Sequence, residues 1–142
     1  MNWIYSDTVK DHFFNPRGVL RDGEKFAADG VGTMGSPMCG DVMKVWIRVD
    51  QKKDRILEMR WQTFGCASAI SSTSMLSEMI AENNGMQIND ALTIKPKDIL
   101  DRLEGLPKNK IHCSVLGDQA LHAAIFDYFK KTHQNDRIKK SQ

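Results

Sequence analysis

The sequence lacks any long hydrophobic run, and this absence limits where the protein can work. None of its 142 residues lies in an apolar stretch approaching the roughly 20 residues that a membrane-spanning helix requires. Residues 1–6 carry neither the apolar segment of a secretory signal nor an arginine-rich transit pattern. We therefore expect a cytoplasmic protein with no membrane partner.

A marked excess of charge is missing too. The formal net charge is only +2 at pH 7, so the composition gives no argument for a nucleic-acid partner. Apolar residues make up 41% of the chain and charged residues 27%, which is ordinary for a soluble globular protein of one domain.

Cysteine is scarce, and its pattern excludes several kinds of site. The three cysteines are odd in number, so they cannot all be paired within the chain, and reduced thiols are the better assumption. They include no C-x2-C pair, which argues against a zinc finger.

The glycine pattern excludes a further kind of site. Gly30, Gly32 and Gly35 do not open a helix, as a dinucleotide-binding loop would require.

The regular elements that are present predict an α+β fold. A helix begins at Ser6 and stops before the turn that starts at Asn15. Clean alternation over residues 41–50 and 56–63 predicts two half-buried strands, joined by a polar turn into an antiparallel hairpin. The expected inward positions are Met43, Val45, Ile47, Val49, Leu57, Met59 and Trp61.

Three helices are expected after the hairpin. The first opens at Cys66 and ends at Asn84, and a short one starts at Pro96. The last keeps a helical apolar period to about Lys131. For the serines of the Cys66 helix we expect only packing and solvation, and for three histidines a surface position; these residues are Ser68, Ser71, Ser72, Ser74, His12, His122 and His133.

The remaining segments are expected to be irregular. Residues 17–38 are rich in glycine and predict a long loop with at most an irregular edge strand around 27–34. We expect one domain over residues 1–131 and a polar, frayed tail over 132–142.

The cysteines lie at the edges of these elements, and the hairpin brings two of them together. Cys39 and Asp41 lie where the first strand begins, and Cys66 follows the end of the second strand, at the same end of the hairpin. His112 and Cys113 precede the last helix, which must pack on the same sheet. At a helix N-terminus, unpaired N–H groups favour the thiolate form of a residue such as Cys66.

Several kinds of chemistry suit this set of residues. Three thiols and one imidazole can form a closed tetrahedral zinc site or the shell of a [2Fe-2S] cluster. Asp41 is then a competing oxygen ligand, a charge that loosens the site, or a plain strand-end carboxylate. A hydrolase or thiol transferase with His112 as the base is disfavoured, because the sequence shows no oxyanion-hole signature. Inert packing of the thiols is the remaining alternative.

Four motifs give the chain a resemblance to the IscU/NifU family of iron–sulfur cluster assembly scaffolds. They occur in family order over nearly the whole chain and together are highly specific. The sequence over residues 3–14 and 61–70 is especially similar to that of the N-terminal domain of NifU. The motifs are Val9-Lys10-Asp11-His12-Phe13 with Asn15-Pro16-Arg17, Cys39-Gly40-Asp41, Thr63-Phe64-Gly65-Cys66-Ala67-Ser68-Ala69-Ile70, and Lys110-Ile111-His112-Cys113-Ser114-Val115-Leu116.

The resemblance implies a fold and a function. The fold is a three-stranded antiparallel sheet with helices packed on it, as in IscU and SufE proteins. Cys39, Cys66 and Cys113 would ligate a transient [2Fe-2S] cluster, with His112 or Asp41 completing the shell and the carboxylate making the cluster labile. Sulfur would come from a cysteine desulfurase, finished clusters would pass to apo iron–sulfur proteins, and zinc could occupy the same site. Such a protein is a carrier and not an enzyme.

The chain departs from the family pattern in ways that narrow these expectations. Residues 106–110 read Leu-Pro-Lys-Asn-Lys, where members served by a dedicated Hsp70-type chaperone have Leu-Pro-Pro-Val-Lys, so that chaperone is not expected as a partner. SufU, a zinc-bound sulfur acceptor that stimulates a desulfurase, usually lacks the histidine found here as His112. The scaffold is therefore favoured over the sulfur acceptor and over a structural zinc protein. Whether two protomers form a homodimer around one cluster stays open.

Overall fold

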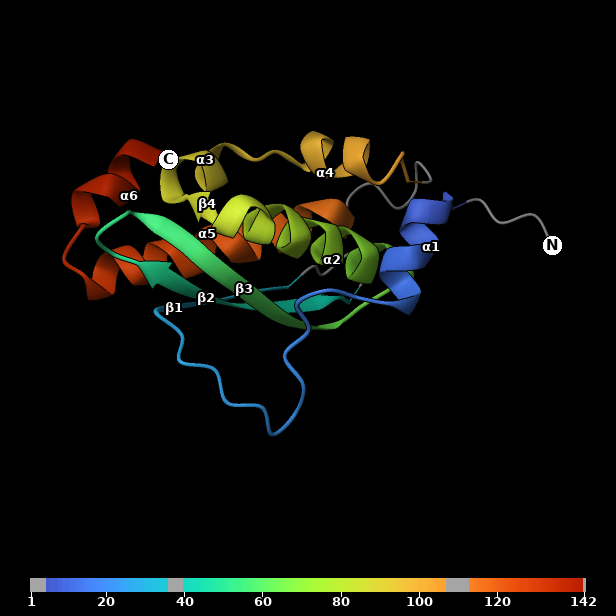
Figure 1. Ribbon diagram of the computed structural model, residues 1–142, viewed down its shortest axis with the longest axis horizontal. Helices are drawn as coiled ribbons and strands as arrows, with labels where there is room; N and C mark the ends of the chain where they lie inside the picture. The colour runs from blue at the N-terminus through green and yellow to red at the C-terminus, as the bar shows by residue number, and fades with distance from the viewer. Residues whose placement is uncertain (1–4, 36–39, 107–112, 142) are drawn as a thin grey trace.

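The computed structural model describes residues 5–35, 40–106 and 113–141 (Figure 1). No helix in these ranges is long and apolar enough to cross a membrane. The elements, in chain order, are α1 (Asp7–Phe14), β1 (Gly30–Gly35), β2 (Val42–Asp50), β3 (Arg55–Phe64), α2 (Ala67–Ala81), η1 (Glu82–Asn84), β4 (Met86–Gln87), α3 (Ile88–Thr93), α4 (Pro96–Arg102), α5 (Cys113–Lys131) and α6 (Asn135–Ser141).

The strands form one antiparallel sheet in the order β1-β2-β3-β4, which confirms the α+β class and the predicted β2–β3 hairpin. The expected number of three strands was wrong. The two residues of β4 pair with Arg55 and Ile56 at the start of β3 and add a fourth strand. A two-residue strand has no alternation to detect, so its sequence gave no sign of it. β1 is regular, pairing through all six residues with β2, where only an irregular edge was expected.

One inward position was also misassigned, because β3 contains a bulge. The pairing with β2 passes from Arg48–Glu58 directly to Val49–Ile56 and leaves Leu57 without an opposite residue. An extra residue reverses the alternation beyond it. Ile56 is therefore fully buried and Leu57 only half-buried, whereas simple alternation had placed Leu57 in the core.

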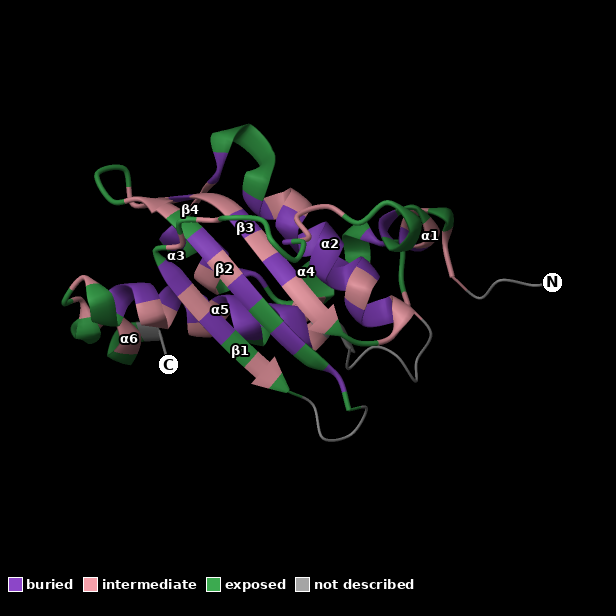
Figure 2. Cartoon of the chain, turned by 90° about the horizontal axis from the view of Figure 1, so that it is seen from below, coloured by how far each residue is buried: buried purple, intermediate pink, exposed green. Residues whose placement is uncertain are grey.

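Helices α2 and α5 cover one face of the sheet, as the two views show together (Figures 1 and 2). Helix α5 packs on β1 and β2, and α2 packs on β3. Glycine allows α5 to approach closely, since a Cβ atom at Gly32 would lie 2.4 Å from the carbonyl oxygen of Ala120. Central members of the core are Met43, Val45, Ile47, Met59, Trp61, Leu76, Ile80, Leu121, Ile125 and Phe129.

Helix α1 is fastened to α2 by buried hydroxyl groups. Ser6 accepts a hydrogen bond from the backbone N–H of Val9, which confirms the predicted helix start. The serines of α2, expected to be partly solvated, are buried instead. Ser71 donates to the carbonyl of Val9 at 2.9 Å, and Ser74 lies 2.7 Å from Nδ1 of His12. Buried hydroxyls need such partners, and here those partners hold two helices together.

His12 is accordingly not a surface residue, as had been expected, but is only 2% exposed. Its Nε2 lies 3.7 Å from Oε2 of Glu78. Burial lowers the pKa of His12 below its ordinary value of 6.5, and Arg17 adds to this lowering while Glu78 opposes it. The apolar period of α1 gave no hint of burial because the partners of His12 lie on another helix.

The end of the chain also differs from expectation. Residues expected to be frayed form α6, which is tied to the rest of the domain by Arg137. Its guanidinium donates to both carboxylate oxygens of Asp54, at 2.8 and 2.9 Å, and lies 4.4 Å from the ring centre of Phe129. Such tertiary contacts stabilise a short helix that sequence propensity alone would not.

Candidate functional site

The candidate site lies where β2 begins and β3 ends. Val42 and Phe64, the terminal residues of the two strands at this end, are paired. Asp41 immediately precedes β2, and Cys66 follows β3 by two residues. The thiol of Cys66 donates a hydrogen bond to Oδ2 of Asp41 at 3.6 Å. The prediction that Asp41 and Cys66 lie at the same end of the hairpin is therefore confirmed, while the predicted approach of Cys39 to Cys66 falls outside the described residues.

Cys66 occupies the N-cap position of α2, as predicted. Its backbone is extended, with φ −76° and ψ 171°, and its carbonyl accepts a hydrogen bond from the N–H of Ile70 at 3.1 Å. The side chain is half-buried, while Asp41 is only 6% exposed. The site thus places a half-buried thiol beside a buried carboxylate, side-chain types that prefer soft and hard metal ions respectively.

The other candidate ligands lie outside the described residues or are described only in their main chain. Cys39 and His112 lie outside the described residues, and of Cys113 only the main chain, as the first residue of α5, is described. Helices α2 and α5 both run from the end of the molecule at which β3 ends (Figure 1), so the start of α5 is at the same end as Cys66. Within the described ranges no group of three or more potential metal ligands is assembled.

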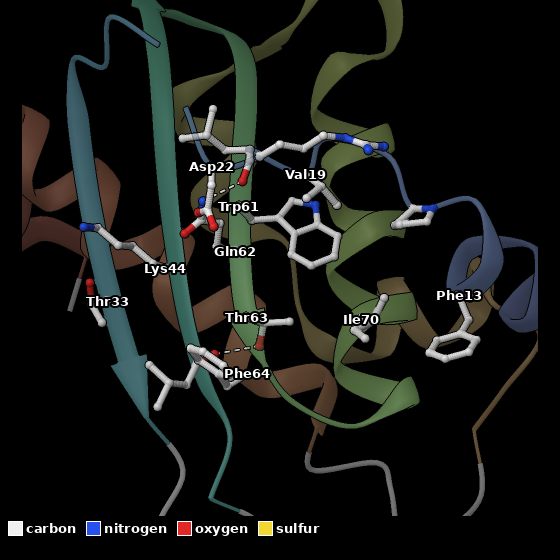
Figure 3. Close-up of a pocket in the computed structure, with 14 residues that line it drawn as sticks. Phe13, Val19, Asp22, Thr33, Lys44, Trp61, Gln62, Thr63, Phe64 and Ile70 are labelled. Carbon is white, nitrogen blue, oxygen red and sulfur yellow. Dashed lines mark hydrogen bonds between the residues drawn. The ribbon is translucent and has the colours of Figure 1, made fainter. Parts of the chain in front are cut away.

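An apolar surface lies next to the Asp41–Cys66 pair. Phe64 is 85% exposed and Val42 43% exposed, although both are large apolar residues at strand ends. They line a cleft of about 810 Å³, shown in Figure 3, which also touches Phe13, Lys44 and Trp61. The cleft adjoins the pair through Phe64 but includes neither Asp41 nor Cys66.

The chain segment after α1 forms the opposite wall of this cleft. Trp61 donates its backbone N–H to the carbonyl of Gly18, and Leu20 donates in turn to the carbonyl of Trp61, both at 2.9 Å. The side-chain amide of Gln62 donates a hydrogen bond to the carbonyl of Leu20 at 2.6 Å. Residues 18–20, which were expected to lie in a loop, are thus hydrogen-bonded along the edge of β3.

Sequence reasoning missed this cleft, although a signal was present. Alternation places Val42 and Phe64 on the outward side of their strands, where polar residues are normal. Apolar residues in outward positions beside a candidate ligand are what an interaction surface requires.

Comparisons with known proteins agree with the geometry. The family described as "NifU-like N terminal domain" matches residues 4–135. Iron-sulfur cluster assembly scaffold protein IscU 1 of Archaeoglobus fulgidus is 49% identical over 136 residues, covering 96% of this chain and 84% of the relative. Nitrogen fixation protein NifU of Trichormus azollae is 46% identical over 129 residues, covering 89% of this chain and 42% of that longer protein.

A solved structure shows the same fold. The crystal structure of a nitrogen-fixing NifU-like protein (N-terminal) from Brucella abortus superposes with a TM-score of 0.64 at 15% identity, covering 89% of this chain and 94% of that one. The resemblance seen in the four motifs is confirmed by these matches. The chain belongs to the NifU-like N-terminal domain family.

Proposed function

We propose that this protein is an iron–sulfur cluster assembly scaffold, a carrier and not an enzyme with turnover. It would build a transient [2Fe-2S] cluster from iron and desulfurase-derived sulfur and transfer it to apo-proteins. The observation that carries the proposal is the Cys66–Asp41 pair, a thiol and a carboxylate placed together at an open sheet end. The similarity to proteins named as such scaffolds supports it.

Cys39, Cys66 and Cys113 are proposed as cluster ligands. Thiolates hold soft iron, and Cys66 meets the requirement of being accessible at a helix N-terminus. His112 or Asp41 would complete the shell. Sulfur arrives when a thiolate attacks the outer sulfur of the donor's persulfide; the donor's S–S bond breaks, a new one forms on this chain, and the donor cysteine leaves as its thiolate.

Asp41 is proposed to make the cargo easy to release. A [2Fe-2S] cluster with its thiolate ligands is anionic, so a carboxylate beside it is repelled by the cargo. A hard oxygen ligand also binds soft iron less firmly than a thiolate does. Release matters for a carrier as much as binding does.

The partners proposed are a cysteine desulfurase and apo iron–sulfur proteins, with a cytoplasmic location. The exposed Phe64 and Val42 beside Cys66 support a docking surface at the site itself. A homodimer around one cluster would use the same surface. The same ligands could instead hold zinc, making the protein a sulfur acceptor that stimulates a desulfurase.

Transfer is the experiment that separates these functions. Protein loaded anaerobically with desulfurase, cysteine and ferrous iron is mixed with apo-ferredoxin, and the ferredoxin spectrum is followed with and without a chelator. Transfer that the chelator does not intercept supports the scaffold. Desulfurase stimulation that requires zinc, without transfer, would support the sulfur acceptor, and zinc whose removal unfolds the protein would indicate a structural site.

A further inference from the structure

We propose that Thr63 is a positioning residue for the site: its hydroxyl holds the end of β2 against β3 and thereby keeps Asp41 beside Cys66. The inference rests on the proposed function for its consequence, which is that Thr63 keeps the cluster labile. The geometry on which it is built does not depend on that function.

The first part of the argument is a hydrogen bond between the strands. Oγ1 of Thr63 donates to the carbonyl oxygen of Val42 at 2.6 Å, as Figure 3 shows. Val42 is the residue next to Asp41, and Thr63 lies three residues before Cys66. The bond therefore joins the two strands beside their terminal Val42–Phe64 pair, close to both site residues, and we call it the Thr63 clasp.

The second part is the space at Gly65. A Cβ atom there would lie 3.0 Å from Oγ1 of Thr63 and 3.2 Å from Cγ of Asp41. Gly65 does not adopt a positive φ, so its conformation is one that other residues can take. A Cβ atom at this position would be in tight contact with the hydroxyl of Thr63, the carboxylate of Asp41 and the Cβ of Ala69, which would have to shift slightly to make room.

The third part is that β3 has little else to hold its end. Its outer edge is bonded to β4 at Arg55 and Ile56 and to the segment 18–20 at Trp61. Beyond Trp61, the backbone of the strand pairs only with β2 in the part of the chain that is described, and one further tie is the Gln62 side chain, which donates to the carbonyl of Leu20 at 2.6 Å. Phe64 and Gly65 are both exposed, so burial contributes little order there.

Thr63→Val, which keeps the shape and removes the hydroxyl, tests the clasp. Thr63→Ser restores the hydroxyl, and Thr33→Val is the control, since Thr33 lines the same cleft from β1. In apo-protein carrying Cys39→Ser and Cys113→Ser, the rate at which iodoacetamide alkylates Cys66 is measured at one pH. A thiol bonded to a carboxylate must break that bond to react, so Thr63→Val should react about threefold faster.

Rescue and a second variant keep this test decisive. Thr63→Ser and Thr33→Val should react at the parent rate. Gly65→Ala retains the hydroxyl but crowds the carboxylate of Asp41, and it should give the same acceleration as Thr63→Val. Equal rates in parent, Thr63→Val and Gly65→Ala would overturn the inference, whether or not the protein binds a cluster.

The consequence for the cluster is measured on loaded protein. Thr63→Val should slow loss of the visible absorption about threefold, as is also expected for Asp41→Ala, and should add nothing in an Asp41→Ala background. A residue that only stabilised the fold would instead speed cluster loss and act equally in both backgrounds. Altered alkylation with no cluster in the parent would contradict the proposed function while leaving the clasp intact.

Discussion

The sulfur of Cys66 and Oδ2 of Asp41 lie 3.6 Å apart, although the two residues are 25 positions apart in the sequence. The contact exists because the β2–β3 hairpin brings the chain back to the end of the sheet at which β2 begins, and α2 starts there. A half-buried thiol and a buried carboxylate share this edge, and the proposed cargo would share it with them.

Replacing Asp41 with alanine should leave the fold intact and slow cluster loss. The change removes a charge that repels the anionic cargo, and we expect the half-life of the visible absorption to rise by about threefold or more. Asp22→Ala is the control, because Asp22 is an exposed carboxylate that lines the neighbouring cleft. Equal half-lives for parent and Asp41→Ala would show that this carboxylate does not set lability.

Replacing Phe64 with serine should weaken desulfurase binding without changing stability. Phe64 is 85% exposed, so its removal costs the folded state little, whereas a partner that covers it would lose about tenfold in affinity. Binding is measured by titration calorimetry and stability by urea unfolding. Phe14→Ser, at another exposed phenylalanine, is the control and should bind as the parent does. Unchanged affinity in Phe64→Ser would place docking elsewhere than beside Cys66.

Acidification should destabilise the protein through His12. Because burial holds the pKa of His12 below 6.5, the unfolded chain takes up a proton at a higher pH than the folded protein does. Stability from this residue is complete above about pH 6.5 and falls as the pH drops from there towards the folded pKa. Urea unfolding at pH 7.5, 6.5 and 5.5 measures this slope.

Variants at two histidines test whether His12 causes this dependence of stability on pH. His12→Gln should be less stable than the parent at pH 7.5 by about 1 kcal/mol, because the contact with Ser74 is lost, and the difference should narrow at pH 5.5. His133→Asn, at an exposed position, should keep the parent's slope. An unchanged slope in His12→Gln would mean that another group is responsible.

Replacing Arg137 with alanine should loosen α6. The pair with Asp54 is partly exposed, so we expect a loss of about 1 kcal/mol, including the contact with Phe129. Hydrogen exchange of the α6 amides should quicken while that of the β2 amides stays the same. Lys140→Ala, on the exposed side of the same helix, is the control. Unchanged α6 exchange in Arg137→Ala would show that the helix is held by other contacts.

Residues with a local signal were predictable from the sequence. Alternation identified β2 and β3, helix periodicity identified α5, and the hairpin then brought Asp41 and Cys66 together. The motifs around these residues identified the family. All of these depend on neighbours in sequence or on one simple connection.

What could not be predicted depends on partners that are distant in sequence. His12 is buried by Ser74 and Glu78 of another helix, and α6 is held by Asp54 in the hairpin turn. The bulge at Leu57 leaves no mark in the alternation, because Ile56 and Leu57 are both apolar. The ligand assignments of all five candidate residues remain predictions from the sequence: Cys39, Asp41, Cys66, His112 and Cys113.

The central claim is tested most directly by the iron, acid-labile sulfide and zinc content of protein reconstituted without oxygen, with its visible spectrum. Iron and sulfide in equal amounts with charge-transfer bands are predicted for the parent chain. Cys113→Ser should lose both while retaining its helical circular dichroism. One tightly held zinc with no sulfide uptake, or an unchanged spectrum in Cys113→Ser, would contradict the account.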